Sequence, residues 1–183
     1  MKHAAVIFLR IRASERLAQF ESNIIEFRVA DKIEMTLTPP KSEEIIAEDL
    51  IAHKGRMKLI QEVLEFSTRK AVTRSKASPD WPLAEQDAVH PLILLELIAQ
   101  TAGICNAWQL VQRQGLGTDV RGWLVGIKEA RFFISSISVN TPIIVTAENK
   151  FEFESFREIK GEAFINNKLA AKATLQVVQA HEK

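Results

Sequence analysis

The chain contains one cysteine among its 183 residues, Cys105. A single thiol cannot form an internal disulfide, and it leaves no cysteine cluster of the kind that binds zinc. Cys105 lies inside an apolar run, where a cysteine is more often a small buried hydrophobe than a nucleophile. The sequence therefore excludes a disulfide framework and fits a reducing, cytoplasmic compartment.

The chain also lacks a long apolar run. No segment reaches the roughly 20 apolar residues that a helix needs to span a bilayer. The apolar start is followed at once by Arg10 and Arg12 and shows no small-residue cleavage site, which argues against a signal peptide. We therefore expect no membrane partner.

An excess of one charge and the common ligand-binding motifs are missing as well. The formal net charge is +1, which argues against nucleic-acid binding driven by bulk charge. Gly115 and Gly117 continue into no phosphate-binding pattern. No paired-histidine spacing indicates a metal, and no serine or cysteine stands in a nucleophile-elbow context. The sequence predicts no nucleic-acid partner, no metal and no cofactor.

What the sequence does contain is the composition of a soluble globular protein, with 46% hydrophobic and 26% charged residues. Its length suffices for one domain with a sizeable core. Pro39 and Pro40 break any regular structure. We therefore divide the chain into an N-terminal extension, residues 1–40, and a compact domain, residues 41–183. Residues 1–34 are expected to be dispensable for folding.

A long helix is predicted at residues 91–114. Pro91 suits the first helical position, His90 the N-cap, and Gly115 the end of the helix. The segment is apolar on nearly every side until Gln109, which predicts a helix buried all round. Strands are predicted before and after it, at residues 58–67, 70–77, 123–133, 142–153, 157–165 and 168–178.

The connections complete the predicted architecture. Residues 78–89 are expected to form a loop, and Asn166 with Asn167 a tight hairpin turn. A helix that is apolar all round needs a sheet curled about it, so we predict an α+β fold in which an antiparallel sheet wraps around one long central helix. Such a sheet leaves an edge strand open, which dimerisation can pair.

Glu96 is a carboxylate in the middle of this apolar helix. Out of water, an ionised carboxylate is costly unless it is paired or takes up a proton. Two interpretations stay open: an acid paired with a lysine or arginine, or a partly buried acid that gives a proton to a leaving group. Gln100 lies one turn on, on the same face, and either orients Glu96 or satisfies a nearby backbone group.

Several segments resemble the 3-hydroxyacyl-ACP dehydratases (FabZ/FabA-like), where ACP is acyl carrier protein. The sequence ELIAQTAG at 96–103 is similar to the central-helix signature of that family, and GIKEARF at 126–132 to its Gly-Ile-Asp-Lys-Ala-Arg-Phe strand. The sequence KGEAFINNKLAAKATLQVV at 160–178 follows the closing hairpin, and AHKGRMKLIQEVLEF at 52–66 the segment leading into the first strand. The resemblance covers roughly residues 45–178 and implies a hotdog fold.

The sequence departs from that family at two motifs. The Gly-His-Phe-Pro motif, which holds the family's catalytic histidine, is replaced by DWP at 80–82. The Pro-Gly pair at the start of the helix is here His90-Pro91, followed by Leu92, and a proline has no N–H to offer. A divergent branch found with aryl-polyene pathways also lacks the histidine motif and has a Pro-His pair before its first strand. The chain resembles that branch most, with His53 in the corresponding place.

The resemblance implies dehydration of a 3-hydroxyacyl thioester to the trans-2-enoyl thioester, without a cofactor. Backbone N–H groups at the start of the helix, such as that of Leu92, would bind the thioester oxygen. A histidine, His53 or His90, would remove the C2 proton, and Glu96 would protonate the departing hydroxyl. Gln100, like Leu92, would be a substrate-binding residue. The alternative interpretation of His53 is a solvated turn residue. The alternative interpretation of His90 is a helix cap or an exposed loop residue.

The resemblance also implies partners. The acyl group would be carried by ACP or by CoA, in fatty acid or polyene-type biosynthesis. Lys128 and Arg131 flank a strand beside the expected acyl channel, where cations can steer an acidic carrier protein, although a solvated strand face is the simpler interpretation. In the resembling family the two catalytic residues come from different subunits, which implies a homodimer or a higher oligomer.

Two other functions stay open. A hotdog acyl thioesterase would use Glu96 as the base for a water that attacks the thioester. A non-catalytic hotdog subunit would bind acyl chains or pair with an active partner. The missing histidine motif favours these two alternatives, whereas the presence of Glu96 and Gln100 favours a dehydratase.

Overall fold

The computed structural model describes residues 50–115 and 117–179. The predicted extension, residues 1–40, and the prediction that residues 1–34 are dispensable lie outside these residues. In chain order the elements are η3 (Gly55–Met57), β1 (Glu62–Phe66), β2 (Lys70–Lys76), β3 (Ala84–Glu85), β4 (Ala88–Val89), α1 (Ile93–Gln114), β5 (Gly122–Phe132), β6 (Ile137–Ser138), β7 (Pro142–Phe153), β8 (Phe156–Ile165) and β9 (Lys168–Gln179).

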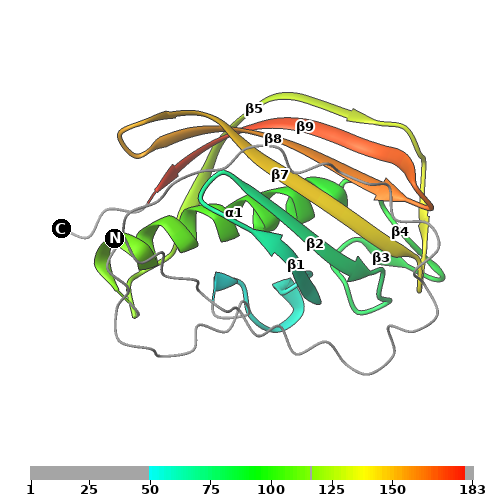
Figure 1. Ribbon diagram of the computed structural model, residues 1–183. Helices are drawn as coiled ribbons and strands as arrows, with labels where there is room; N and C mark the ends of the chain where they lie inside the picture. The colour runs from blue at the N-terminus through cyan, green and yellow to red at the C-terminus, as the bar shows by residue number, and fades with distance from the viewer. Residues whose placement is uncertain (1–49, 116, 180–183) are drawn as a thin grey trace, which may run out of the picture. The chain divides into compact units, whose positions relative to one another are not determined.

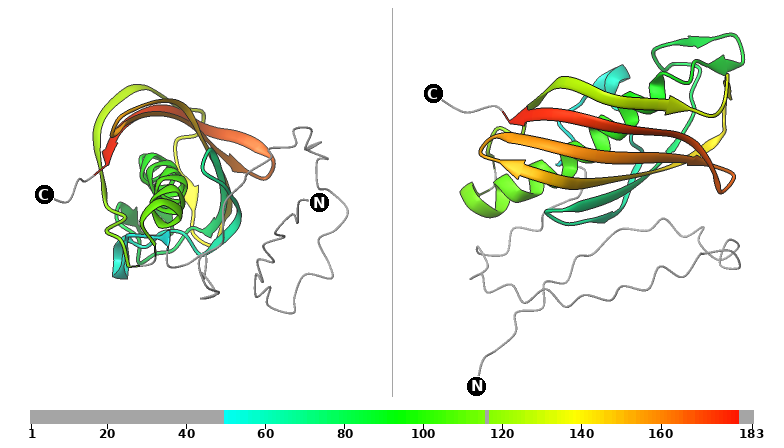
Figure 2. Two further views of the ribbon diagram at one scale, coloured as in Figure 1. Left: turned by 60° about the vertical axis from the view of Figure 1, so that its left-hand side comes forward. Right: turned by 90° about the horizontal axis from the view of Figure 1, so that it is seen from above.

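Six strands form one antiparallel sheet in the order β1-β2-β7-β8-β9-β5. The sheet curls around α1, which lies on its concave side (Figures 1 and 2). The predicted architecture, an antiparallel sheet wrapped around one long helix, is confirmed. Among residues 50–115 and 117–179 the sheet does not close on itself, and β1 and β5 are its two edges.

Alternation of buried and exposed side chains explains the inner face of the sheet. In β8 the buried positions are Arg157, Ile159, Gly161 and Ala163, every second residue. At Gly161 the helix packs directly on the strand, since a Cβ atom there would lie 2.1 Å from Cγ2 of Ile98. The contact between α1 and the sheet therefore depends on the missing side chain at this position.

The prediction that the helix is buried on every side holds for most of α1 but not for one stripe. Glu96, Ala99, Gly103 and Asn106, spaced three or four residues apart, are half-exposed. Most of the other side chains of the helix are buried against the sheet. The open stripe follows from the sheet, which wraps around the helix without closing. Glu96 lies at the start of this stripe.

The observed elements agree with the predicted ones in most places. The predicted helix is α1, and β7 has the predicted bounds, residues 142–153. Asn166 and Asn167 have φ angles of 50° and 60°, as the two central residues of a type I′ hairpin turn require.

Two segments differ from the prediction. Residues 78–89, expected as a loop, contain β3 and β4, which pair with each other, and β4 also pairs with β6. Strands of two residues are too short to show an alternating pattern. The strand expected at 58–67 begins only at Glu62, and the N–H groups of Lys58 and Leu59 donate to the backbone oxygen of Gly55 and to Gln100 instead of to another strand.

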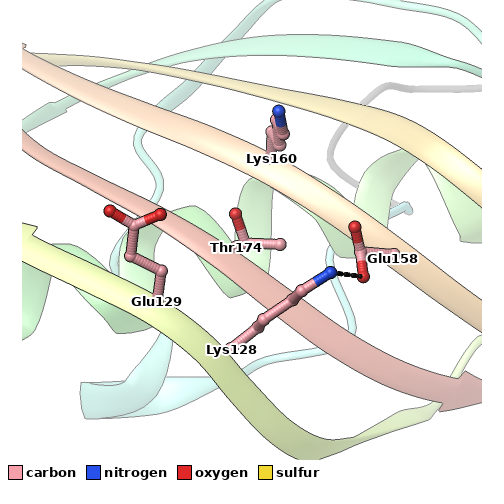
Figure 3. A pocket seen from close by; sticks show the side chains of 5 residues that line it. All are labelled: Lys128, Glu129, Glu158, Lys160 and Thr174. Carbon is pink, nitrogen blue, oxygen red and sulfur yellow. Dashed lines mark hydrogen bonds and ion pairs between the residues drawn. The ribbon is translucent and has the colours of Figure 1, made fainter.

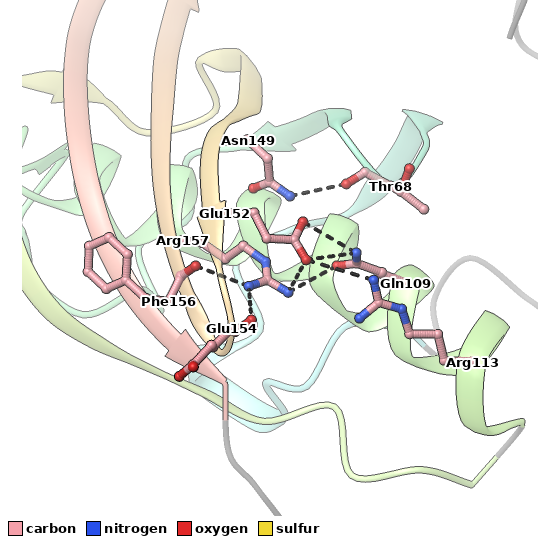
Figure 4. Close-up of polar contacts among 8 residues, drawn as sticks. All are labelled: Thr68, Gln109, Arg113, Asn149, Glu152, Glu154, Phe156 and Arg157. Atoms are coloured by element: carbon pink, nitrogen blue, oxygen red, sulfur yellow. Dashed lines mark hydrogen bonds and ion pairs between the residues drawn. The ribbon is translucent and has the colours of Figure 1, made fainter.

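Arg157 joins the β7–β8 hairpin to the C-terminal half of α1 (Figure 4). Its side chain is 2% exposed, and its guanidinium lies 2.7 Å from Oε1 of Glu152. It also donates to the backbone oxygens of Glu154 and Phe156 and to Oε1 of Gln109. Burial lowers the pKa of Arg157, and the charge of Glu152 opposes that shift. The network fixes the hairpin against the end of the helix that is far from Glu96.

Candidate active site

His53 and Glu96 meet on the half-exposed stripe of α1. Nε2 of His53 lies 3.4 Å from Oε1 of Glu96, and the two side chains are 42% and 31% exposed. His53 comes from the segment just before η3, whereas Glu96 lies in the first turn of α1. The contact puts a proton acceptor and a carboxyl group side by side, within reach of solvent and of a substrate.

Gln100 fixes Glu96 to this segment. Its Nε2 donates to Oε1 of Glu96 at 2.9 Å and to the backbone oxygen of Met57 at 2.6 Å, and its Oε1 accepts from the backbone N–H of Leu59 at 3.1 Å. Gln100 is 2% exposed. The two interpretations of Gln100 are therefore compatible, since one buried amide contacts Glu96 and also satisfies two backbone groups.

His90 lies apart from this pair. It is exposed, and its Nδ1 accepts a hydrogen bond from the backbone N–H of Leu92 at 3.2 Å. The N–H groups of Ile93, Leu94 and Leu95 donate to backbone oxygens three residues earlier. The sequence predicted His90 as the N-cap of a helix that starts at Pro91, but α1 begins at Ile93 with Leu92 at the N-cap position, where no side chain caps the helix. His90 lies in the turn just ahead of α1, and its Nδ1 engages the N–H of Leu92, the group expected to bind a thioester oxygen.

Lys128 and Arg131 lie on the convex face of the sheet, opposite to α1. Nζ of Lys128 donates to Glu158 at 3.2 Å, and Nε of Arg131 lies 2.6 Å from a carboxylate oxygen of Glu129. The hollow beside Lys128 has a volume of about 420 Å³ (Figure 3) and is lined by Lys128, Glu129, Glu158, Lys160 and Thr174. Because both cations are paired with carboxylates and face away from Glu96, the structure does not bring them to the candidate site.

Two backbone groups of the site had no side-chain signal in the sequence: the backbone oxygen of Met57 and the backbone N–H of Leu59. Both belong to the segment around η3, where the chain turns before it enters β1. The nearest signal was Gly55, because a glycine readily adopts the positive φ that this turn requires.

Cys105 is the one cysteine of the chain and therefore the one thiol that could act as a nucleophile. Cys105 is fully buried, and desolvation by burial raises the pKa of its thiol to about 12. A thiol that stays protonated at neutral pH is a poor nucleophile, so Cys105 is the buried hydrophobe that the sequence predicted.

Within residues 50–115 and 117–179, no group of three or more His, Cys, Asp or Glu side chains is placed to hold a metal. In the same residues, no helix is long and apolar enough to cross a membrane.

Comparison with known proteins shows which family the sequence of this chain matches. A family model described as ApeP dehydratase (ApeP-like) matches residues 45–183. No curated protein sequence matches the chain.

Solved structures share the fold. The dehydratase heterocomplex ApeI:P from Xenorhabdus doucetiae matches with a TM-score of 0.67 and 18% identity, over 75% of this chain and 93% of that one. A hypothetical thioesterase protein with coenzyme A from Streptococcus pneumoniae TIGR4 matches with a TM-score of 0.51 and 14% identity, over 67% and 87%. Cj0977, a sigma28-regulated virulence protein from Campylobacter jejuni, matches with a TM-score of 0.54 and 12% identity, over 74% and 96%. These likenesses confirm the predicted hotdog fold.

Proposed function

Because the chain belongs to the ApeP-like dehydratase family, we propose that it converts a 3-hydroxyacyl thioester into the trans-2-enoyl thioester, in fatty acid or polyene-type biosynthesis. The observation that carries the proposal is the 3.4 Å contact between Nε2 of His53 and Oε1 of Glu96, which Gln100 holds in place. Elimination of water needs a base for one carbon and an acid for its neighbour, and this contact supplies both.

In the proposed reaction, neutral His53 takes the C2 proton and protonated Glu96 donates to the C3 hydroxyl. The C2–H electron pair becomes the C2=C3 double bond, the C3–O bond breaks, and water leaves. His53 is then an imidazolium and Glu96 a carboxylate. Since the two groups touch, the proton returns from His53 to Glu96 and restores the starting state without any cofactor.

Both proposed catalytic groups lie in one chain. This differs from the arrangement that the resemblance implied, in which the two residues come from different subunits. In this chain DWP stands at 80–82, where the family has its histidine motif, and the histidine that contacts Glu96 comes from the segment ahead of η3.

We further propose that two copies of the chain pair through β5. This edge strand has exposed apolar side chains on its inner face, Leu124 at 48%, Ile127 at 49% and Phe132 at 38%. They face the same side as buried residues of β9, to which they are paired in register. A second sheet edge would satisfy the open hydrogen-bonding groups of β5, and the copy behind it would cover these side chains.

A thioesterase is the second candidate function. A fold relative from Streptococcus pneumoniae is described as a hypothetical thioesterase with coenzyme A, and Glu96 is exposed enough to activate a water. A non-catalytic subunit is the third, favoured by the engagement of the N–H groups at the start of α1.

One experiment separates the three functions. The protein is incubated with 3-hydroxyacyl and saturated acyl thioesters, carried on ACP and on CoA. A dehydratase forms the enoyl thioester from the hydroxylated substrates alone. A thioesterase releases free thiol, and a binding subunit leaves every substrate unchanged, so either result contradicts the proposed dehydration.

A further inference from the structure

Three cations stand close together in the turn that follows His53. Lys54, Arg56 and Lys58 are all exposed, and residues 52–61 contain no carboxylate side chain. Nε of Arg56 donates to the backbone oxygen of Asp80 at 3.2 Å. None of the three cations forms an ion pair within the described residues.

The contrast with the strands is marked. Many cations of the sheet are neutralised by a carboxylate on the same strand, on the neighbouring strand or, for Lys128, on the strand after that. Such pairs are Lys70–Glu65, Arg74–Glu62, Lys128–Glu158, Arg131–Glu129 and Lys150–Glu148. Three like charges on one turn, none of them paired in the part of the chain that the structure describes, create a local positive potential, which raises the rate of encounter with an acidic partner.

The turn is joined directly to the candidate active site. Lys54 follows His53 in the chain, and the backbone oxygen of Met57 accepts the hydrogen bond from Gln100 that also holds Glu96. Met57 is 41% exposed between Arg56 and Lys58. A partner that docks here would meet an apolar side chain flanked by cations, next to the reacting groups.

The backbone of the turn favours a protein partner over a nucleotide phosphate. Phosphate sites are typically concave and use free backbone N–H groups. Here the N–H of Lys58 donates to the backbone oxygen of Gly55, and the N–H of Leu59 donates to Gln100. The cations are therefore presented by side chains alone, as in a protein–protein contact with complementary charge.

We propose that Lys54, Arg56, Met57 and Lys58 form the docking surface for an acidic acyl carrier protein, which delivers its thioester to His53 and Glu96. The inference rests on the proposed function and names the partner of that same site. It replaces Lys128 and Arg131, the docking residues expected from the sequence, which are paired with carboxylates on the opposite face.

The test compares two double variants. Lys54→Glu with Lys58→Glu reverses two charges of the docking surface and spares Arg56, which holds Asp80. The matched control, Lys160→Glu with Lys168→Glu, makes the same change of net charge at exposed positions of β8 and β9. For both variants kcat and KM are measured with one 3-hydroxyacyl chain on ACP, on CoA and on N-acetylcysteamine.

We expect the docking variant to lose about tenfold or more in kcat/KM on the ACP substrate, through KM, because steering by charge acts on encounter. Its rate on the N-acetylcysteamine thioester should stay at the wild-type level, and the control should match wild type on every substrate. The wild-type rate on ACP should fall with added salt, more steeply than that of the docking variant.

Equal rates of the docking and control variants on the ACP substrate would overturn the proposal. A loss of the same size on CoA would show that the cations bind a phosphate common to both carriers, and would overturn docking of a protein. A loss on N-acetylcysteamine would make the turn part of the catalytic machinery instead.

A binding measurement distinguishes failure of the proposed dehydratase function from failure of the proposed docking surface. If wild type dehydrates none of the three substrates, holo-ACP is titrated into wild type and both variants by calorimetry. Weaker binding by the docking variant alone would support the docking surface in a protein that is not a dehydratase. Equal binding by all three proteins, or no binding, would overturn it.

Discussion

At the scale of single residues, Glu96 and His53 form the contact on which the proposed chemistry depends. The resemblance to dehydratases pointed to both residues, but it left His53 and His90 as alternatives. The structure separates them, because His53 touches Glu96 whereas His90 accepts a hydrogen bond from the N–H of Leu92 in the turn ahead of α1. No pattern in the sequence shows that a turn ahead of β1 folds back onto α1.

Replacement of the acid tests its role most directly. Glu96→Gln keeps the shape of the side chain and an oxygen that can accept from Gln100, but it cannot transfer a proton. We expect kcat to fall on the order of 10²–10⁴-fold, the usual contribution of a positioned acid or base. The melting temperature should stay within a few degrees of wild type, because Glu96 is only partly buried. Full activity of this variant would contradict the proposed mechanism.

The two histidines give a matched pair of variants. His53→Ala should lower kcat by an amount similar to Glu96→Gln, whereas His90→Ala should leave kcat within a few-fold of wild type. His90→Ala should instead reduce stability by about 1 kcal/mol, since it removes the hydrogen bond that Nδ1 accepts from the N–H of Leu92. Steady-state rates and thermal unfolding of both variants check this. A larger loss of rate for His90→Ala than for His53→Ala would reverse the assignment of the base.

At the scale of elements, the periodic segments were predictable and the irregular ones were not. The register of β5 illustrates the difference. Simple alternation places Lys128 on the same face as Leu124 and Phe132, beside the helix. The strand contains irregularities near Val125 and Lys128, and Lys128 instead contacts Glu158 on the convex face. A bulge changes the face of one residue without leaving a mark in the hydrophobic pattern, so alternation in the sequence cannot tell on which face of the sheet Lys128 lies.

Packing of α1 on β8 should be sensitive to one methyl group. Gly161→Ala would put a Cβ atom 2.1 Å from Cγ2 of Ile98, so helix and strand must move apart. We expect a loss of stability of about 1–3 kcal/mol, the usual cost of overpacking a core. In the control, Gly126→Ala, the new atom meets the end of a flexible side chain, Oε1 of Gln176 at 2.6 Å, and the loss should be smaller. Denaturant unfolding of both variants measures the difference, and equal losses would show that the helix adjusts freely.

At the scale of the whole molecule, the open edge at β5 predicts the oligomeric state. Light scattering at micromolar concentration should give twice the 20.6 kDa mass of the chain. Ile127→Lys places a charge among the exposed apolar side chains of β5 and should shift the mass toward the monomer. Lys172→Glu, on the outer face of the neighbouring β9, is the control and should leave the mass unchanged. A wild-type monomer would refute pairing through β5.

The contact between His53 and Glu96 within one chain has a genetic consequence. Where two subunits share an active site, a subunit without the acid and a subunit without the base can rescue each other, since a mixed dimer regains one intact site. Here each site takes both groups from one chain, so every site in a mixed dimer of the two variants lacks one group. Coexpression of the Glu96→Gln and His53→Ala chains should therefore show no complementation, and activity restored by mixing them would place the two groups in different subunits.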